Sequence, residues 1–588
     1  MSQPVFPGPF RHHASTAARL LLAAALAVLS ACSGSGGSDA SASAAAAEAA
    51  SLNLPSIGPA SSAPAGGTPL PQEKRLPLSE ISRFMSQATF GPTSPDELVA
   101  IQTYGFEQWM MQQFDLPAAS QLDYVKATAR LREDGRPVEE NSYEAIWQQW
   151  LYGKDQLRAR VAFALSQILV ISNIAPDLNP LAMSSYMDML NRNAFGNYRT
   201  LLEEVTLHPA MGYYLNMLGS EKEDPESGRL PNENYAREIL QLFSIGLVKL
   251  NPDGTPVTGP DGQPIPTYDQ QVVLGFAKAF SGWSFGGRNA ADPDAFQSGD
   301  ENWTVPMQPW AQKHSAGPKL LFDGRVIAGG QSPRKDMADA LDAIFQHPNV
   351  GPFVARRLIQ RLVTSNPSPA YVGRVAAVFG RNALGQRGDL KAVVWAILLD
   401  PEARDASLAA SNTAGKQREP VIRFANMLRG LGARSANGRN AIHYLDSADN
   451  ALGQSPLLSP TVFNFYSPDY KMPGPAAQAG LVAPEFQITN ETTVVGTLNF
   501  FANLVQEGGY GGDESRLALD YAPLEALAAD PAKLIDRLGL MFMNDSVSPQ
   551  TRAAMMRTLT AIPASDKAGR VKAALTLTAV APDFVIQR

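Results

Sequence analysis

Residues 337–362 read MADALDAIFQHPNVGPFVARRLIQRL, and this stretch contains the unit from which the rest of the chain is built. Apolar side chains recur at helical spacing from Met337 to Phe345 and again from Phe353 to Leu362, and His347-Pro348 separates the two runs. Proline excludes the residue before it from the helical region but is well suited to the start of a helix. The stretch therefore predicts two helices joined by a sharp corner.

Three other apolar runs end in the same way. They are Leu201 to His208-Pro209, Leu390 to Asp400-Pro401 and Val571 to Ala581-Pro582. Strand signals are scarce, so we expect a mainly α fold over residues 76–588, a large helical body of helix-corner-helix units. A division into two lobes, at about 76–330 and 331–588, is an open alternative to a single body.

Two turn motifs interrupt the helical pattern. Asn251-Pro252-Asp253-Gly254 and Gly259-Pro260-Asp261-Gly262 both contain Asp-Gly, which favours tight turns. We expect a small β-hairpin insertion near 250–270. A calcium loop is less favoured, because the alternating acidic ligands and the final glutamate of an EF-hand are missing.

The chain begins with an apparent export signal. Basic residues precede the apolar run Leu20–Leu29, which is too short to span a bilayer, and Leu29-Ser30-Ala31-Cys32 follows. These four residues resemble a bacterial lipobox, in which the cysteine is acylated with chains such as palmitate. We predict a lipoprotein signal peptide over 1–31 and lipidation of Cys32. The alternative is an ordinary secretory peptide with an incidental cysteine.

Residues 32–75 are dominated by serine, alanine, glycine and proline, and few of the others are apolar. Such a segment has too few apolar side chains to offset its ordering entropy, so we expect a disordered tether. The predicted localisation is the cell envelope, with a lipid anchor in the membrane and the body extracytoplasmic. Ser33 favours the outer membrane of a Gram-negative host.

Composition narrows the classes of function. The formal net charge is -7 and Cys32 is the single cysteine. The acidic balance disfavours nucleic acid as a partner, and one thiol excludes an intrachain disulfide, an iron-sulfur cluster on this chain's thiolates and a multi-cysteine zinc site. We therefore predict no metal and no cofactor.

The most polar helical stretch lies at 232–243, NENYAREILQLF. On a helix Tyr235, Ile239 and Leu242 share an apolar face, and the opposite stripe carries Asn234, Arg237, Glu238 and Gln241. The stripe is either a solvated surface, with Glu233 and Arg237 as an ordinary pair, or a network beside a cleft. In the second reading Glu238 acts as acid, base or orienting carboxylate, and Arg237 holds an anion.

Weaker candidates lie in two loops and on one helix. His314 and Lys319 belong to a glycine-containing loop that could bind an anion or simply pack, whereas His208 and His347 precede prolines, where a capping role suffices. Arg356, Arg357 and Arg361 form a basic helix face, solvated or anion-binding. A proline-bounded run contains Phe463, Phe465, Tyr466 and Tyr470. These rings either form an aromatic platform that stacks on glycan or pack into the core beneath a loop.

The stretch 232–246, NENYAREILQLFSIG, resembles the signature of a bacterial family catalogued as domain of unknown function 1800. Collinear strings at 277–283, 314–321, 347–363, 388–401 and 582–588 agree with it. The resemblance implies exported, mostly helical proteins, often encoded beside a sulfatase-like family, and it implies no activity. Ser315 departs from the acidic residue that follows the motif histidine in many relatives, which weakens a metal or catalytic role for His314.

Two functions remain open at this point. The favoured one is a membrane-tethered accessory or binding protein for a surface polymer such as glycan, or for an exported sulfatase-like partner. The alternative is an extracytoplasmic hydrolase or lyase acting on polysaccharide through Glu238 and a second carboxylate, Glu233 or Glu204.

Overall fold

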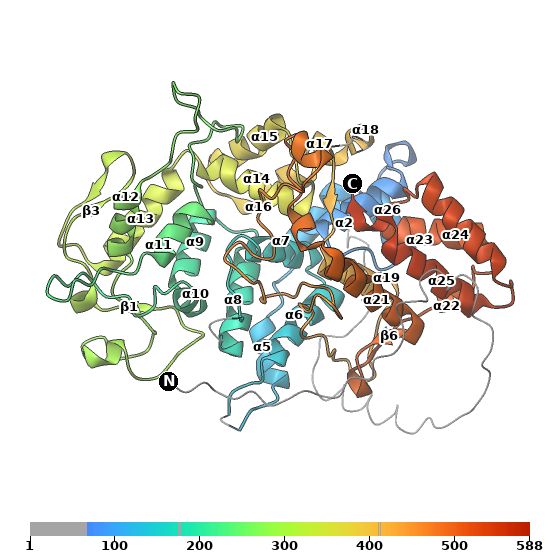
Figure 1. Ribbon diagram of the computed structural model, residues 1–588, viewed down its shortest axis with the longest axis horizontal. Helices are drawn as coiled ribbons and strands as arrows, with labels where there is room; N and C mark the ends of the chain where they lie inside the picture. Colours follow the sequence, from blue (N-terminus) through green and yellow to red (C-terminus); the bar gives the residue numbers. More distant parts are fainter. Residues whose placement is uncertain (1–67, 134, 175–177, 410, 412) are drawn as a thin grey trace.

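The computed structural model describes residues 68–588 except 134, 175–177, 410 and 412 (Figure 1). The signal peptide, Cys32 and nearly all of the tether lie outside the described residues, so lipidation stays a prediction. In the described part of the chain, no helix combines the length and apolar character needed to cross a membrane.

The described chain is mainly helical, as the sequence predicts. The first helices are α2 (Leu78–Ala88), α3 (Pro95–Tyr104), α4 (Phe106–Asp115), α5 (Gln121–Thr128), α6 (Glu140–Tyr152), α7 (Gln156–Ser166) and α8 (Pro180–Asn193). They are followed by α9 (Tyr198–Leu207), α10 (Pro209–Tyr214), α11 (Asn234–Gln241), α12 (Gln270–Ala279), α13 (Pro333–Gln346), α14 (Val350–Leu362), α15 (Pro369–Gly380), α16 (Leu390–Leu398), α17 (Pro401–Arg404) and α18 (Ala406–Ala409). The last are α19 (Pro420–Gly430), α20 (Pro475–Gln478), α21 (Glu491–Glu507), α22 (Ala522–Glu525), α23 (Pro531–Phe542), α24 (Pro549–Ala561), α25 (Lys567–Val580) and α26 (Pro582–Val585).

Short antiparallel strand pairs connect the helices. They are β1 (Trp283–Ser284) with β2 (Gln308–Pro309), β3 (Lys319–Leu320) with β4 (Val326–Ile327), β5 (Lys416–Gln417) with β8 (Ile586–Gln587), and β6 (Gly509–Tyr510) with β7 (Leu517–Ala518). The pairing of β5 with β8 ties the C-terminus to the middle of the chain.

The four predicted corners are confirmed. At two of them histidine is the hinge: His208 Nδ1 accepts a hydrogen bond from the Ala210 amide at 3.2 Å, and His347 Nδ1 accepts one from the Asn349 amide at 3.1 Å. Both side chains thereby satisfy a backbone donor near the start of the following helix, which is the expected capping role.

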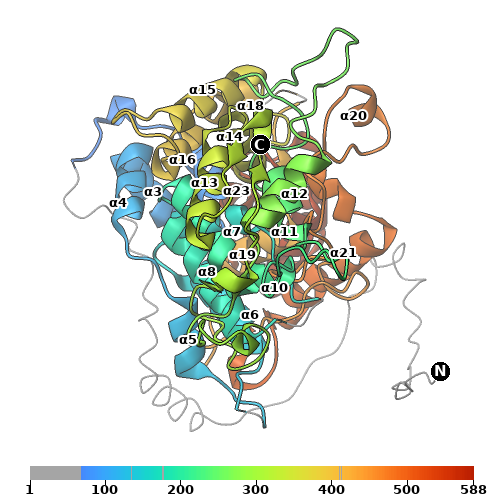
Figure 2. The same ribbon diagram turned by 90° about the vertical axis from the view of Figure 1, so that its left-hand side faces the viewer.

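The predicted insertion is an arm over residues 247–267, which projects as the green loop at the top of Figures 1 and 2. Its three segments are joined by backbone bonds such as Val257 N to Lys249 O at 2.8 Å and Ile265 N to Val257 O at 2.9 Å. Gly254 and Gly262 have positive φ values of 77° and 75° in the two turns. Prolines within the segments lack the N–H needed for regular strands, so the arm contains isolated bridges instead.

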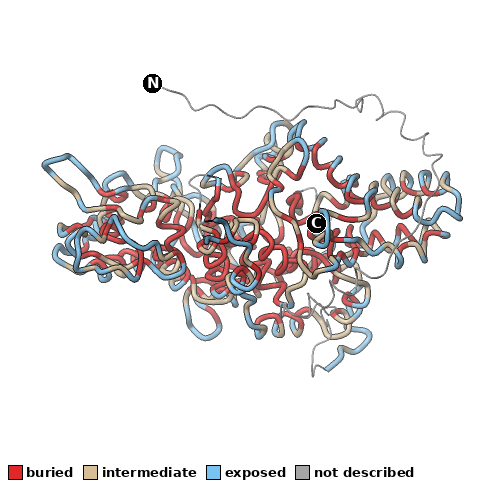
Figure 3. Tube along the Cα trace, turned by 90° about the horizontal axis from the view of Figure 1, so that it is seen from below, coloured by how far each residue is buried: buried red, intermediate tan, exposed pale blue. Residues whose placement is uncertain are grey.

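Buried residues run through the whole body (Figure 3). One hydrophobic cluster includes residues from Ile81 in α2 to Phe584 in α26. Figures 1 and 2 place α10 to α13 at one end of the molecule, with α23 to α26 toward the other. The division into two lobes stays a prediction.

Candidate functional site

Helix α11 carries the polar stripe near one end of the molecule. Asn232 lies two residues before the helix, and its side-chain oxygen accepts a hydrogen bond from the amide of Asn234, the first helical residue, at 2.9 Å. The apolar face is buried, and Tyr235 donates or accepts a hydrogen bond with Thr206 at 2.6 Å beneath it. This face anchors the helix and leaves the polar stripe at the surface.

The exposed part of the stripe forms its own network. Arg237 donates to Glu233 Oε2 at 2.9 Å, and Gln270 of α12 donates to the same oxygen at 2.6 Å. Asn234 donates to Asn216 Oδ1 at 3.1 Å. Arg237 is therefore engaged with Glu233, while its effect on Glu238 is electrostatic.

Glu238 differs from its neighbours. It is 8% exposed, and its Oε2 is buried without a hydrogen-bond partner among the described residues. Burial raises the pKa of this carboxyl above its ordinary value, and Arg237 opposes the shift. Glu238 therefore keeps its proton to a higher pH than an exposed glutamate does.

Two tyrosines share the environment of Glu238. Burial, together with the charge of Glu238, raises the pKa of Tyr214 and of Tyr268 to about 12. The Tyr268 hydroxyl is also buried and has no partner within the described chain. An unpaired carboxyl oxygen and an unpaired hydroxyl therefore lie in one electrostatically coupled group.

A pocket of about 350 Å³ adjoins the C-terminal end of α11. Features far apart in the sequence line it: Gln241 of the stripe, Gly254 and Pro256 of the arm, Arg356 of α14, and Phe463 of the aromatic run. Phe463 is 42% exposed, so its ring is available to a ligand. Glu238 is not among the lining residues of this pocket.

The two adjacent arginines in this wall have different surroundings. Arg357 makes a two-pronged ion pair with Asp469, at 3.1 and 2.8 Å. Arg356 makes no ion pair or hydrogen bond with any described side chain, and its Nε is buried. Burial lowers the pKa of Arg356, the charge of Arg357 adds to this effect, and the nearby Asp469 carboxylate opposes it. Arg356 is thus a half-buried cation that makes no ion pair of its own within the described chain.

The four aromatic residues occupy separate environments. Phe463 faces the pocket beside Arg356, whereas Phe465 packs against the core and lines a small cavity with Gln167 and Asn464. Tyr466 is fully buried, donates to Glu419 and stacks under Arg361, whose guanidinium carbon is 4.5 Å from the ring centroid. Tyr470 is partly exposed. The rings therefore do not present a single flat face.

His314 and Lys319 meet at a buried aspartate. His314 Nε2 is 2.8 Å and Lys319 Nζ is 2.5 Å from the same Asp336 oxygen, and Asp336 is 0% exposed. Lys319 also donates to the Ser315 carbonyl at 2.7 Å. This cluster joins the loop to the start of α13 and matches the packing alternative for the loop.

A second cavity, of about 540 Å³, brings Glu204 and His208 together with Ser185 and Asp188, which the sequence pattern did not indicate. Ser185 Oγ lies 3.1 Å from His208 Nε2, but His208 Nδ1 already accepts from a backbone amide. Nε2 therefore carries the proton, and burial lowers the pKa of His208 to about 3. The pair lacks a base that could activate the serine.

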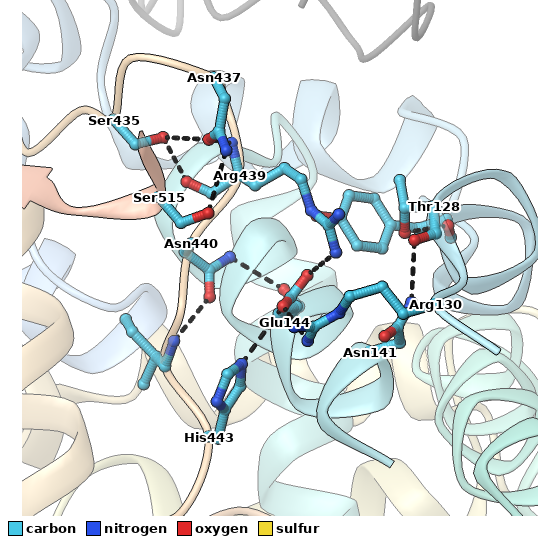
Figure 4. A network of polar contacts seen from close by, with 12 residues as sticks. Thr128, Arg130, Asn141, Glu144, Ser435, Asn437, Arg439, Asn440, His443 and Ser515 are labelled. Carbon is cyan, nitrogen blue, oxygen red and sulfur yellow. Dashed lines mark hydrogen bonds and ion pairs between the residues drawn. The ribbon is translucent and has the colours of Figure 1, made fainter. Parts of the chain in front are cut away.

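Glu144 of α6 is the centre of another network that the sequence did not reveal (Figure 4). It is 3% exposed and accepts from Arg130 at 3.0 Å, Arg439 at 2.5 Å and His443 at 3.2 Å. Asn440 also donates to the Glu144 carbonyl at 3.1 Å. The partners lie up to 299 residues away in sequence, so local spacing gave no signal.

Comparisons with known proteins identify the family of the chain but assign no reaction to it. In the described ranges, no group of three or more His, Cys, Asp or Glu side chains is arranged to hold a metal ion. No curated protein and no solved structure matches the chain. The model of a family described as protein of unknown function (DUF1800) matches residues 83–586. Because this match covers most of the sequence, the chain belongs to the DUF1800 family.

Proposed function

We propose that the protein is an exported, lipid-anchored binding protein whose pocket beside α11 takes an acidic sugar of a surface polysaccharide. The observation that carries this proposal is the unpaired, half-buried guanidinium of Arg356 in the pocket wall. The Nε atom of Arg356 is enclosed and unpaired while the rest of the side chain is only partly buried, so a carboxylate or sulfate of a ligand can reach the guanidinium and pair with it.

The remaining lining residues fit the same chemistry. A sugar ring has an apolar face that stacks on an aromatic ring such as Phe463, and its hydroxyls pair with an amide such as Gln241. Both carboxylate oxygens of Asp469 accept hydrogen bonds from Arg357, so Asp469 acts on Arg356 through its charge alone and leaves the Arg356 guanidinium without a hydrogen-bonded anion. The anionic group on the sugar is a carboxylate or a sulfate, since both match the guanidinium fork.

The experiment measures binding of three polymers to purified wild-type protein by calorimetry: oligogalacturonate with carboxylates, carrageenan oligosaccharide with sulfates, and neutral galactan. Arg356→Gln should weaken binding of the acidic polymer about ten-fold or more. Arg381→Gln, at an exposed arginine, is the matched control and should leave it unchanged. Equal binding of all three polymers, or an unaffected Arg356→Gln variant, would contradict the proposal.

The membrane anchor and the partner need their own tests. Mass spectrometry of the mature protein should find acylated Cys32, and Cys32→Ala should release the body from the membrane fraction. An exported sulfatase-like protein, implied by the family resemblance, is the partner class to examine by co-purification from the native host. If the mature protein lacks the signal peptide, carries no acyl group on Cys32 and is found outside the membrane fraction, the predicted lipid anchor is wrong.

A hydrolase or lyase is the second candidate, and the unpaired Glu238 oxygen, whose charge also acts on the Tyr268 hydroxyl, favours it. Glu238 would protonate the leaving group. Its two proposed partner carboxylates are otherwise engaged: Glu233 accepts from Arg237, and Glu204 lines the cavity that contains His208. Polysaccharide cleavage that Glu238→Gln abolishes would establish this candidate, and absence of cleavage by wild type across acidic and neutral glycans would reject it.

A further inference from the structure

A cavity of about 660 Å³ lies where α5 and α6 meet the segment before α5. Its volume is typical of small-molecule sites. Residues of three segments line it, including Leu116 and Pro117 before α5, Gln121 and Tyr124 of α5, and Gln148 of α6. It shares no lining residue with the pocket beside α11.

Two successive glutamines in this wall contrast sharply. Gln149 donates to Asp155 at 3.0 Å and to Asn191 at 3.2 Å, and its oxygen accepts from Gln121 at 2.9 Å. Gln148 is 5% exposed, and neither its amide nitrogen nor its amide oxygen has a hydrogen-bond partner among the described residues. Buried amides are almost always paired in native proteins, so Gln148 requires an explanation.

A further unpaired atom lies in the same wall. Gln121 uses its amide nitrogen on Gln149, but its Oε1 is buried and accepts nothing from the described chain. Residues that line the cavity thus contribute two unpaired amide oxygens and one unpaired amide nitrogen, all three enclosed, and the Tyr124 hydroxyl is a further enclosed and unpaired atom in the described chain. A hydroxyl group both donates and accepts, so a hydroxyl-rich ligand can pair with these amides once their side chains turn toward the cavity.

The charges of the wall point to an uncharged ligand. Asp155 Oδ2 already accepts from the Ala119 amide and from Gln149, each at 3.0 Å. The other charged residues of the lining, Asp123 and Lys154, have opposite signs and are both exposed to solvent rather than buried against the cavity. Leu116, Pro117 and several alanines supply an apolar face. We propose that this cavity binds a neutral saccharide unit, and this proposal does not depend on the acidic-sugar pocket at Arg356.

The Glu144 network holds this wall in place (Figure 4). Glu144 lies one helical turn before Gln148 on α6, so the two side chains share a face. Asn141 donates to the Thr128 carbonyl at 3.0 Å, and Arg130 pairs with Glu144, so the end of α5 is bound to α6. A wall fixed in this way is organised before the ligand arrives, which lowers the entropic cost of binding.

The test measures saturation-transfer NMR and calorimetry on the purified body with maltotriose, cellotriose, diacetylchitobiose and glycerol at millimolar concentration. At least one saccharide should bind, and glycerol should not. Gln148→Leu should weaken binding about ten-fold or more while the melting temperature stays level or rises, because an unpaired amide is removed. Gln149→Leu, the matched control, should lower the melting temperature. If Gln148→Leu fails to fold, Gln148→Glu replaces it.

Three outcomes would overturn the proposal. They are no binding of any saccharide by wild type, equal binding by the Gln148 variant, and glycerol binding as strong as that of the sugars. Loss of acidic-polymer binding in Arg356→Gln with intact neutral-sugar binding would separate the two sites.

Discussion

The regions around α6 and α11 each bury a glutamate, and they treat it in opposite ways. Glu144 on α6 accepts from two arginines and a histidine, whereas Glu238 on α11 has one carboxylate oxygen that accepts nothing from the described chain. The first arrangement links three segments that are distant in the sequence. In the second, a carboxylate oxygen stays available for a hydrogen bond or a proton transfer. The difference teaches that, in a chain without a recognised catalytic motif, unsatisfied buried polar groups are better guides to a site than buried charge itself.

The largest loss of stability is expected at another buried acidic residue with charged partners, Asp336. Asp336→Ala removes the anion shared by His314 and Lys319, and it leaves a fully buried ammonium with the neutral Ser315 carbonyl as its partner and no counter-charge. We expect a loss of about 3–5 kcal/mol in unfolding free energy, measured by urea denaturation. Asp339→Ala, which removes an exposed pair with Lys335, is the control and should cost less than about 0.5 kcal/mol. Similar losses in both variants would refute a structural role for Asp336.

Glu144→Gln should have the next largest effect. The variant keeps the shape of the side chain but removes the charge that Arg439 and Arg130 share, and Arg130 is half exposed and can be solvated. We expect a loss of about 2–3 kcal/mol in the same assay. An unchanged unfolding free energy would mean that Glu144, like Glu238, is not needed for folding. The contrast drawn between the two glutamates would then be wrong.

Glu238→Gln should have a small effect of the opposite sign. Because burial raises the folded-state pKa of Glu238, the folded state keeps a proton that the unfolded state releases, and wild-type stability falls as pH rises above the ordinary glutamate pKa of 4.5. Glutamine cannot ionise, so the Glu238→Gln variant does not lose stability in this way as the pH rises. The variant should match wild type in acid and exceed it by about 1 kcal/mol at neutral pH. A variant that is less stable at neutral pH would show that the charged form is stabilised in the fold.

The smallest effect on stability is expected for Arg356→Gln. Since Arg356 makes no ion pair or hydrogen bond in the described chain and is only partly buried, its removal should change the unfolding free energy by less than about 0.5 kcal/mol. Arg357→Gln leaves Asp469 without its two-pronged partner and should cost about 1 kcal/mol. Thermal denaturation of the two variants side by side checks this order, and the reverse order would argue that Arg356 supports the fold.

Local pattern was sufficient for the fold. Apolar spacing and the X-Pro corners predicted the helices and their junctions, because helix boundaries depend on nearby residues. The Asp-Gly pairs similarly located both turns of the arm, although its prolines prevented regular strands.

The candidate site could be predicted only in part. The polar stripe was visible as a pattern, but the difference between Arg356 and Arg357 depends on Asp469, which lies 112 residues beyond Arg357. The difference between Gln148 and Gln149 likewise depends on Asn191 and Gln121, which tertiary packing brings to one of them. Residue type and spacing predict capacity for hydrogen bonding, whereas long-range packing decides which groups are left unpaired.

The most direct test of this account is a crystal structure of the protein with an acidic oligosaccharide from the binding assay. The account predicts a carboxylate or sulfate within hydrogen-bond distance of the Arg356 guanidinium, a sugar ring against Phe463, and the pair between Arg357 and Asp469 intact. An acidic oligosaccharide bound elsewhere, with the Arg356 guanidinium still unpaired, would contradict it.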